Sequence, residues 1–134
     1  MSLSSFYPVV QVDDPAPSAT FFVEHLGFEP TFETDWYVSL RRDHHEIAFL
    51  RHDHPTIPEG FRQPSRGLLV NLEVDDAKAE HRRLVGERGL DERLPLRDEA
   101  FGQRHFILEA PGGLLVDVIE EIEPAPEFAA AYDV

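Results

Sequence analysis

Histidines and carboxylates are the side chains of this sequence that are best suited to chemistry. His44, His45, His52 and His54 fall within eleven residues, and imidazole is a common ligand of zinc and nickel. These four lie in a predicted turn and loop, which lack the rigid scaffold and supporting hydrogen bonds of a metal site. We therefore expect only adventitious metal binding there.

His105 lies in a different pattern, because the carboxylates Glu73 and Asp117 occur on two other predicted strands. A histidine beside a carboxylate can act as a general acid or base, and the carboxylates can bind a cationic group. Solvated carboxylates on a sheet surface are an equally good interpretation of the same pattern.

Four aromatic residues, Tyr7, Trp36, Tyr37 and Phe101, form a second set of interest. Aromatic rings stack on planar molecules and attract cations over their faces. Aromatic residues in strands more often pack in a core or at an interface, so the set has two interpretations.

Several classes of site are excluded by what the sequence lacks. Cysteine is absent, which excludes disulfides, thiolate metal sites and a cysteine nucleophile. The sequence contains no glycine-rich phosphate loop, no GxSxG motif and no HExxH pair.

The charge of the chain is strongly acidic. Twelve basic and 26 acidic residues give a formal net charge of −14 and a pI of about 4.7. Such a field attracts cationic ligands and repels nucleic acids and anionic membranes, so we expect neither as a partner. No apolar run approaches the roughly 18 residues that cross a bilayer, and no secretory signal pattern opens the chain, which predicts a cytoplasmic protein.

The elements that must position these residues occur twice. Val12-Asp13-Asp14 and Val74-Asp75-Asp76 match at an offset of 62 residues (74 − 12 = 62), and Gly27 and Gly89 keep that offset. Each match lies between an alternating strand pattern and an amphipathic helix pattern. Each copy is therefore predicted as βαβββ, with strands at 7–12, 28–33, 36–42 and 46–50 and a helix at 15–26 in the first, and strands at 67–74, 92–96, 103–109 and 114–120 and a helix at 76–88 in the second.

The domain organisation follows from this repeat. A chain of 134 residues has the length of one domain, since single cores usually organise 100 to 200 residues. We expect module one at about 6–51, a proline-containing linker at about 52–66, module two at about 67–121 and a tail at 122–134. The tail is expected to be frayed or docked on a partner.

The repeated unit and the segments YPVVQVDD, FFVEHLGF and GQRHFILEAPGGLLVDVIE resemble the vicinal oxygen chelate superfamily. Its members include glyoxalase I, extradiol dioxygenases and the fosfomycin- and bleomycin-resistance proteins. The resemblance covers about residues 6–121 and implies an α+β fold, in which two βαβββ modules form a curved, cup-shaped mixed sheet with helices on the outer face. It also implies a small molecule bound in the cup and a homodimer.

In the metalloenzymes of that superfamily, the metal ligands come from the first and last strands of each module. The matching positions here are Tyr7, Ala48, Leu69 and Asp117. A metal site needs about three or four groups drawn from His, Glu and Asp, so we expect neither a metal nor another cofactor.

The chain instead resembles the metal-free bleomycin-resistance branch, through YPV at residues 7–9 and FGQR at 101–104. With the four matching positions facing inward, strand alternation predicts which side chains line the cup, and the apolar alternate residues pack under the helices. Together with the aromatic residues, the predicted ligand-binding set is Tyr7, Gln11, Trp36, Tyr37, Ser39, Arg41, Ala48, Leu69, Asn71, Glu73, Phe101, Gln103, His105 and Asp117.

The leading hypothesis is a metal-independent protein that binds and sequesters a cationic or aromatic, antibiotic-like molecule, as in antibiotic resistance. One alternative is a metal-free enzyme that uses His105 or Tyr7 as an acid or base. The other is a metal-dependent lyase or dioxygenase with a displaced ligand set that includes Asp117 and His105. The sequence leaves open whether a reaction is catalysed.

Overall fold

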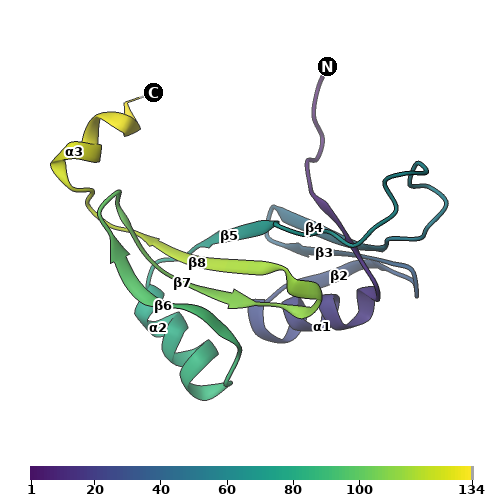
Figure 1. The fold of residues 1–134 in the computed structure, drawn as a ribbon, viewed down its shortest axis with the longest axis horizontal. Helices are drawn as coiled ribbons and strands as arrows, with labels where there is room; N and C mark the ends of the chain where they lie inside the picture. The colour runs from purple at the N-terminus through teal and green to yellow at the C-terminus, as the bar shows by residue number, and fades with distance from the viewer. Residues whose placement is uncertain (134) are drawn as a thin grey trace. The chain divides into compact units, whose positions relative to one another are not determined.

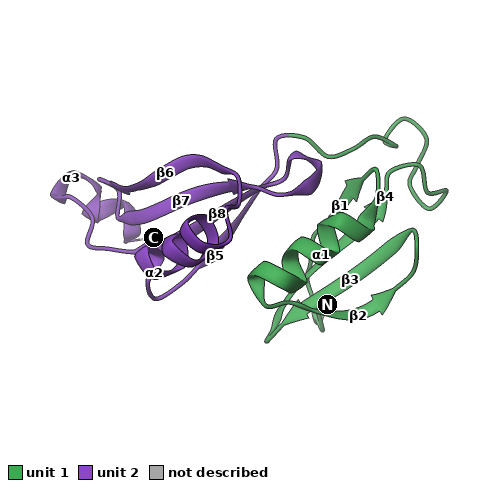
Figure 2. Ribbon diagram, turned by 90° about the horizontal axis from the view of Figure 1, so that it is seen from below, with its two compact units in different colours: residues 1–66 green, residues 67–134 purple. Residues whose placement is uncertain are grey.

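Each half of the chain folds as a strand, a helix and three further strands (Figure 1), which confirms the predicted α+β class and βαβββ order. The structure is a computed structural model that describes residues 1–133. It divides into two units, Met1–Arg66 and Gly67–Val134 (Figure 2), and each unit contains its own four-stranded mixed sheet.

In the first unit, the strand order across the sheet is β1-β4-β3-β2. Strand β1 is parallel to β4, and the other neighbouring strands are antiparallel. Helix α1 contacts β2, β3 and β4. The elements are β1 (Val9–Val12), α1 (Pro15–Leu26), β2 (Glu29–Glu33), β3 (Tyr37–Arg42) and β4 (His45–Arg51).

Helix α1 begins and ends where the sequence predicts. The Asp14 side chain accepts a hydrogen bond from a first-turn backbone N–H at 3.1 Å, and Pro15 lies at the start, where no backbone donor is needed. Gly27 follows the helix with φ of 75°, a left-handed conformation that glycine adopts at little cost. Phe22 packs on Phe49 of β4 with ring centroids 5.3 Å apart, which fixes the helix on the sheet.

In the second unit, the strand order is β5-β8-β7-β6, and β5 is parallel to β8. The unit repeats the plan of the first and adds a short C-terminal helix. The elements are β5 (Leu69–Glu73), α2 (Ala77–His81), a π-helical segment (Arg82–Glu87), β6 (Glu92–Glu99), β7 (Gln103–Glu109), a 3-10 turn (Pro111–Gly113), β8 (Leu115–Glu121), α3 (Pro126–Ala129) and a second 3-10 turn (Ala130–Tyr132).

The second helix differs from the single α-helix predicted at 76–88. Asp76 caps it, accepting a hydrogen bond from the Ala79 backbone at 3.0 Å, but α-helical geometry ends at His81. The following turns are π-helical and contain Gly86, which lowers α-helical stability. They still bury Leu84, so the packing that the apolar pattern predicts is retained.

Strand β6 runs to Glu99, beyond the predicted strand at 92–96. The added residues are charged, which is why the pattern of residue types favours a loop there. In the sheet, Asp98 lies opposite Arg104 of β7, and their Oδ1 and Nε atoms are 2.8 Å apart. Such cross-strand pairs stabilise a charged strand segment, and they are invisible in the sequence of one strand.

Much of the core of each unit lies between its helix and one sheet face, as the strand alternation predicts, although Ala48 and Ile119 are buried on the other face. Val10 and Phe49 in the first unit, and Phe106 and Val118 in the second, are at most 2% exposed. Burying such a side chain contributes about 1.5–3 kcal/mol. The opposite sheet faces, termed here the helix-free faces, therefore carry the alternate residues, which include the predicted ligand-binding strand positions.

Within residues 1–133, no helix combines the length and the apolar character needed to cross a membrane.

Candidate ligand-binding faces of the two sheets

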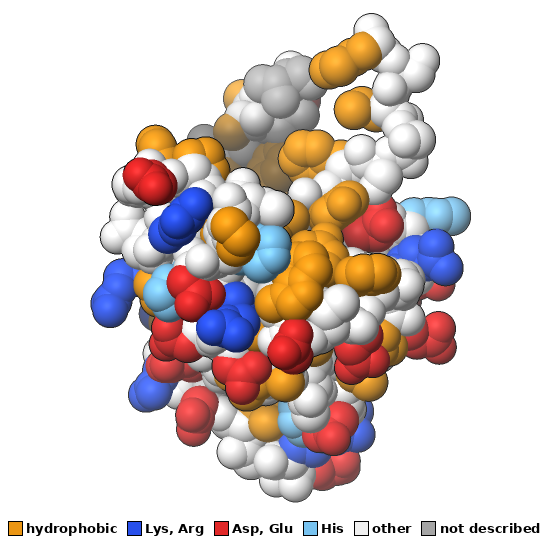
Figure 3. Space-filling view, turned by 90° about the vertical axis from the view of Figure 1, so that its right-hand side faces the viewer, with side chains coloured by type: hydrophobic (Ala, Val, Ile, Leu, Met, Phe, Trp, Pro, Cys, Tyr) orange, Lys and Arg blue, Asp and Glu red, His pale blue; other side chains and the backbone are white. Residues whose placement is uncertain are grey.

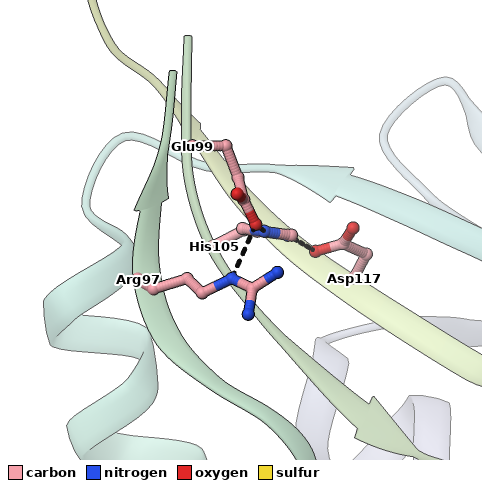
Figure 4. A network of polar contacts seen from close by, with 4 residues as sticks. All are labelled: Arg97, Glu99, His105 and Asp117. Atoms are coloured by element: carbon pink, nitrogen blue, oxygen red, sulfur yellow. Dashed lines mark hydrogen bonds and ion pairs between the residues drawn. The ribbon is translucent and has the colours of Figure 1, made fainter. Parts of the chain in front are cut away.

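His105 in β7 is held between two carboxylates on the helix-free face of the second sheet (Figure 4). Its Nδ1 lies 2.8 Å from Oδ1 of Asp117 in β8, and its Nε2 lies 2.8 Å from Oε2 of Glu99 at the end of β6. Arg97 of β6 donates from Nε to the same Glu99 oxygen at 2.7 Å. A charged imidazole donates from both nitrogens, so this geometry suits an imidazolium between two carboxylates.

The His105 network is mostly buried, and its contacts decide its charge. The side chains of His105 and Asp117 are each only 7% exposed. Burial lowers the pKa of His105, but hydrogen bonds to Glu99 and Asp117 outweigh it, and the pKa lies above its ordinary value of 6.5. The hydrogen bonds from His105 and Arg97 lower the pKa of Glu99. The network thus favours the charged form of the histidine, which burial alone would disfavour.

Two further carboxylates lie together at the edge of the same face. A hydrogen bond with Glu121 of β8, and then its charge, raise the pKa of Glu73 of β5. Carboxylates this close favour a shared proton or a cation between them. The second sheet therefore offers an acidic surface around a buried histidine. By contrast, Figure 3 displays the side of the molecule on which the first unit is drawn, where hydrophobic side chains gather among acidic and basic ones.

The helix-free face of the first sheet is aromatic instead. Burial, and then a hydrogen bond with Tyr7, raise the pKa of Tyr37 in β3. The Tyr37 ring lies 6.0 Å from the ring of Phe32 in β2 and 5.9 Å from that of Trp36. Tyr7 and Phe32 are nevertheless 42% and 55% exposed. These rings are held by their neighbours and remain accessible to a ligand.

The four histidines of residues 44–54 do not converge on one point. His54 stacks on Trp36 with ring centroids 4.1 Å apart, and its Nδ1 lies 2.8 Å from the hydroxyl of Thr56. His52 places Nε2 3.1 Å from Asp13, while the other two lie at the turn between β3 and β4. In the described part of the chain, no group of three or more His, Asp or Glu residues is arranged to hold a metal ion.

Gln11 of β1 forms hydrogen bonds with the segment that follows β4. Its Nε2 donates to the backbone oxygens of Phe61 and Gln63, at 2.9 and 2.8 Å. Its backbone N–H donates to the hydroxyl of Ser65 at 3.1 Å. The side chain therefore anchors the end of the predicted linker on the first sheet.

The remaining predicted residues have varied surroundings. The Ser39 hydroxyl lies 2.7 Å from that of Thr31, and Ala48 is fully buried in β4. Phe101 lies in the turn between β6 and β7 and contacts Phe128 of the tail, with ring centroids 6.3 Å apart. The others on the strands are Arg41, Leu69 and Asn71, which are exposed, and Gln103, which is half-buried.

Sequence reasoning missed Glu99, Arg97 and Phe32 on these faces. Glu99 and Arg97 lie in the part of β6 that was predicted as a loop, so strand alternation was not applied to them. Arg97 lies opposite His105 in the sheet, so the two side chains share a face. If the strand had been predicted to continue to residue 99, strand alternation would have placed Glu99 on that face as well.

The four positions that correspond to metal ligands in the metalloenzymes do not fit a metal here. Ala48 and Leu69 carry no ligating atom. The Tyr7 hydroxyl is hydrogen-bonded to Tyr37, and an oxygen of Asp117 is hydrogen-bonded to His105. One carboxylate is fewer than the three or four donors that such an ion requires.

The fold is shared with several solved structures. The bleomycin-binding protein of Streptomyces verticillus, in complex with copper(II)-bleomycin, is 21% identical, with a TM-score of 0.62 over 88% of this chain and 96% of that chain. A lactoylglutathione lyase from Agrobacterium tumefaciens is 14% identical, with a TM-score of 0.72 over 90% of this chain and 96% of that chain.

A third similar structure is a superfamily member from Sphaerobacter thermophilus, 22% identical, with a TM-score of 0.71 over 90% of this chain and 99% of that chain. A comparison with curated proteins gave no match. The model of the Glyoxalase/Bleomycin resistance protein/Dioxygenase superfamily matches residues 6–118. Since that region covers most of the chain and reaches the last strand of the second unit, the chain belongs to the glyoxalase/bleomycin resistance protein/dioxygenase superfamily.

Proposed function

We propose that this protein binds a small organic molecule that combines an aromatic ring with a cationic group, and that binding needs no metal ion held by the protein. The observation that carries the proposal is the group of accessible rings on the first sheet, Tyr7, Phe32 and Tyr37, with Trp36 beside them. Such rings stack on planar groups and attract cations, with about 0.5–2 kcal/mol for each cation contact.

Charge supports a cationic ligand. The net charge of −14 attracts cations over a long range and raises their rate of association. On the second sheet, Glu73 and Glu121 lie within hydrogen-bond distance of each other, and a ligand cation would relieve their repulsion.

The similar structure from Streptomyces verticillus supports a choice of first ligand, because it contains copper(II)-bleomycin. Bleomycin-type molecules carry planar heteroaromatic and cationic groups, and both kinds of group interact favourably with aromatic rings such as those of the first sheet. Sequestration of such an antibiotic is the role that we propose for the protein.

An acid–base reaction centred on His105 has less support. Its Nδ1 and Nε2 each contact a carboxylate of the protein, so neither nitrogen is available to a substrate in this arrangement. A general acid or base must reach the proton that it transfers. Binding is therefore favoured over metal-free catalysis by His105.

The superfamily resemblance also supports a homodimer. Sedimentation equilibrium is expected to give twice the chain mass of 15.3 kDa. A single-chain mass at micromolar concentration would contradict this part of the proposal.

Titration of chelator-treated protein tests the binding proposal, with the fluorescence of Trp36, the single tryptophan, as the signal. The ligands are metal-free bleomycin, copper(II)-bleomycin and tryptamine as a minimal aromatic cation. We expect a saturable change with metal-free bleomycin, and Tyr37→Leu should weaken it about tenfold because the ring contact is lost.

Phe61→Leu is the matched control, since Phe61 is an exposed aromatic residue of the linker, and it should change the affinity less than about twofold. Absence of a saturable change with every ligand would overturn the proposal. Binding that appears only after a free metal ion is added would overturn its metal independence.

A further inference from the structure

The C-terminal segment after β8 returns to the turn between β6 and β7. The backbone N–H of Ile122 donates to the carbonyl of Gly102 at 3.0 Å, and that of Ala125 donates to the carbonyl of Ala100 at 2.8 Å. Figures 1 and 2 both show α3 beside the β6–β7 end of the sheet. The tail is therefore docked on its own unit.

Side chains of the tail extend this contact. The Tyr132 hydroxyl donates to the carbonyl of Phe101, and the Phe128 ring packs edge-on against the Phe101 ring at 82°. Both contacts are made with Phe101, so the tail is attached to the turn through backbone and side-chain contacts.

The turn is shaped to accept the tail. Gly102 has φ of 110°, where residues with a side chain are strained. A Cβ at this position would lie 3.0 Å from the carbonyl oxygen of Ile122 and 3.2 Å from the Tyr132 hydroxyl. Glycine thus permits both the turn and the close approach of the tail.

The same turn directly follows Glu99, whose carboxylate contacts His105. The backbone N–H of Gly102 donates to the carbonyl of Glu99 at 3.0 Å, which closes the turn on the residue whose carboxylate contacts Nε2 of His105. Asp117, the other partner of His105, lies in the interior strand β8, where it is opposite Ile107 of β7.

We propose that residues 122–132 form a strap that holds Glu99 against Nε2 of His105, with Phe128 and Tyr132 as positioning residues. Release of the strap frees the turn, withdraws the Glu99 carboxylate and leaves Nε2 open to the helix-free face, while Nδ1 stays bonded to Asp117. The strap thereby controls which nitrogen of His105 a ligand can reach, whatever that ligand is.

The two ring N–H groups of His105 provide the test within one side chain. Their exchange with solvent is measured by nitrogen-15 NMR of the full chain at pH 5.5, where the imidazole is charged and both nitrogens donate. In Phe128→Ala/Tyr132→Phe we expect exchange at Nε2 to accelerate at least about tenfold, because local opening exposes it. Exchange at Nδ1 should stay within about twofold.

Two further variants set the limits of the experiment. Glu99→Gln removes the charge that holds Nε2 and should accelerate its exchange at least as much as the tail variant. Glu127→Ala changes an exposed tail residue outside these contacts and should leave both rates unchanged. Gly102→Val should reproduce the effect of the tail variant, since its side chain would meet the strap.

Unchanged exchange at Nε2 in the tail variant and in Gly102→Val would overturn the strap. Equal acceleration at Nδ1 and Nε2 would also overturn it, because that result describes general loosening of the unit rather than withdrawal of Glu99.

Discussion

The two sheets share a backbone plan and a strand register but differ in the chemistry of their helix-free faces. Val9 lies beside Ala48 in the first sheet as Asn71 lies beside Asp117 in the second, so Ala48 and Asp117 occupy equivalent positions. The offset between Val9 and Asn71 is the 62 residues of the sequence repeat (71 − 9 = 62). Register therefore carries over from one unit to the other.

Tyr37 and His105 are equivalent in the same way, because they lie opposite Leu50 and Ile119 on the last strand of each unit. The first sheet has a phenol near an alanine at these positions, and the second has an imidazole bonded to a carboxylate. Backbone geometry thus determines which side chains are neighbours. The residue types at those positions determine whether the contact between them is aromatic or ionic. A buried ion pair is tolerated where each charge satisfies the other.

The largest effect is expected when the ionic pair of the second sheet is broken. Asp117→Ala leaves a buried histidine without its Nδ1 partner, and we expect a loss of about 4 kcal/mol in the free energy of unfolding. Urea unfolding followed by circular dichroism measures it. Glu109→Ala removes a partner from the exposed pair with Arg93 and should cost less than about 1 kcal/mol. Similar losses in the two variants would contradict the importance assigned to burial.

Introducing a carboxylate and an imidazole at the equivalent positions tests whether the first sheet can accept the same ionic pair. Ala48→Asp places a carboxylate at a fully buried position without a partner, and we expect a loss of about 3 kcal/mol. Adding Tyr37→His supplies the equivalent imidazole and should restore about 1–2 kcal/mol. Additive losses in the double variant would show that the two sheets are not equivalent in side-chain geometry.

The pH dependence of stability should differ when the histidine is removed. The pKa of His105 is raised in the folded state, so its contribution is complete below about 6.5, the pKa of an unfolded histidine, and is lost as pH rises through the folded pKa. The free energy of unfolding of the native chain should therefore fall above pH 6.5. In His105→Gln the side chain at this position does not titrate, so the decrease in stability that His105 causes above pH 6.5 should disappear. An unchanged pH profile would contradict the raised pKa of His105.

A smaller effect is expected at the equivalent edge positions, Gln11 and Glu73. Gln11→Ala removes the two hydrogen bonds to the linker and should cost about 1 kcal/mol. Limited proteolysis should then cleave residues 58–66 faster than in the native chain. Cleavage at an unchanged rate would show that other contacts hold the linker.

The smallest effect is expected from Glu73→Gln. Contact with Glu121 raises the pKa of Glu73, so the folded state favours its protonated form and loses stability as the carboxyl ionises with rising pH. The amide removes this repulsion and should make the chain slightly more stable at pH 7, with no gain at pH 3. A loss of stability at pH 7 would contradict the sign.

Local sequence signals were sufficient for much of this fold. Strand alternation predicted the buried face of β1, and Asp14, Pro15 and Gly27 predicted the limits of α1. Alternation did not predict that β4 is buried on both faces. These signals act between near neighbours, and each appears in a short stretch of sequence. The expectation that no metal is bound came from the resemblance together with residue types, and it stays a prediction.

Interactions between distant residues had to come from the tertiary structure. Glu99 reaches His105 only because β6 pairs with β7 through charged residues, and His105 meets Asp117 only because β7 pairs with β8. The docking of Tyr132 on the turn at Phe101 joins residues 31 positions apart.

The sequence by itself determined the repeat, the order of its elements and the sheet faces that pack under the helices, because these depend on periodicity and local capping. Only the tertiary structure decided which charges pair, which histidine is held between carboxylates and where the tail docks. These outcomes depend on strand register and on burial, and the composition of a single segment contains neither.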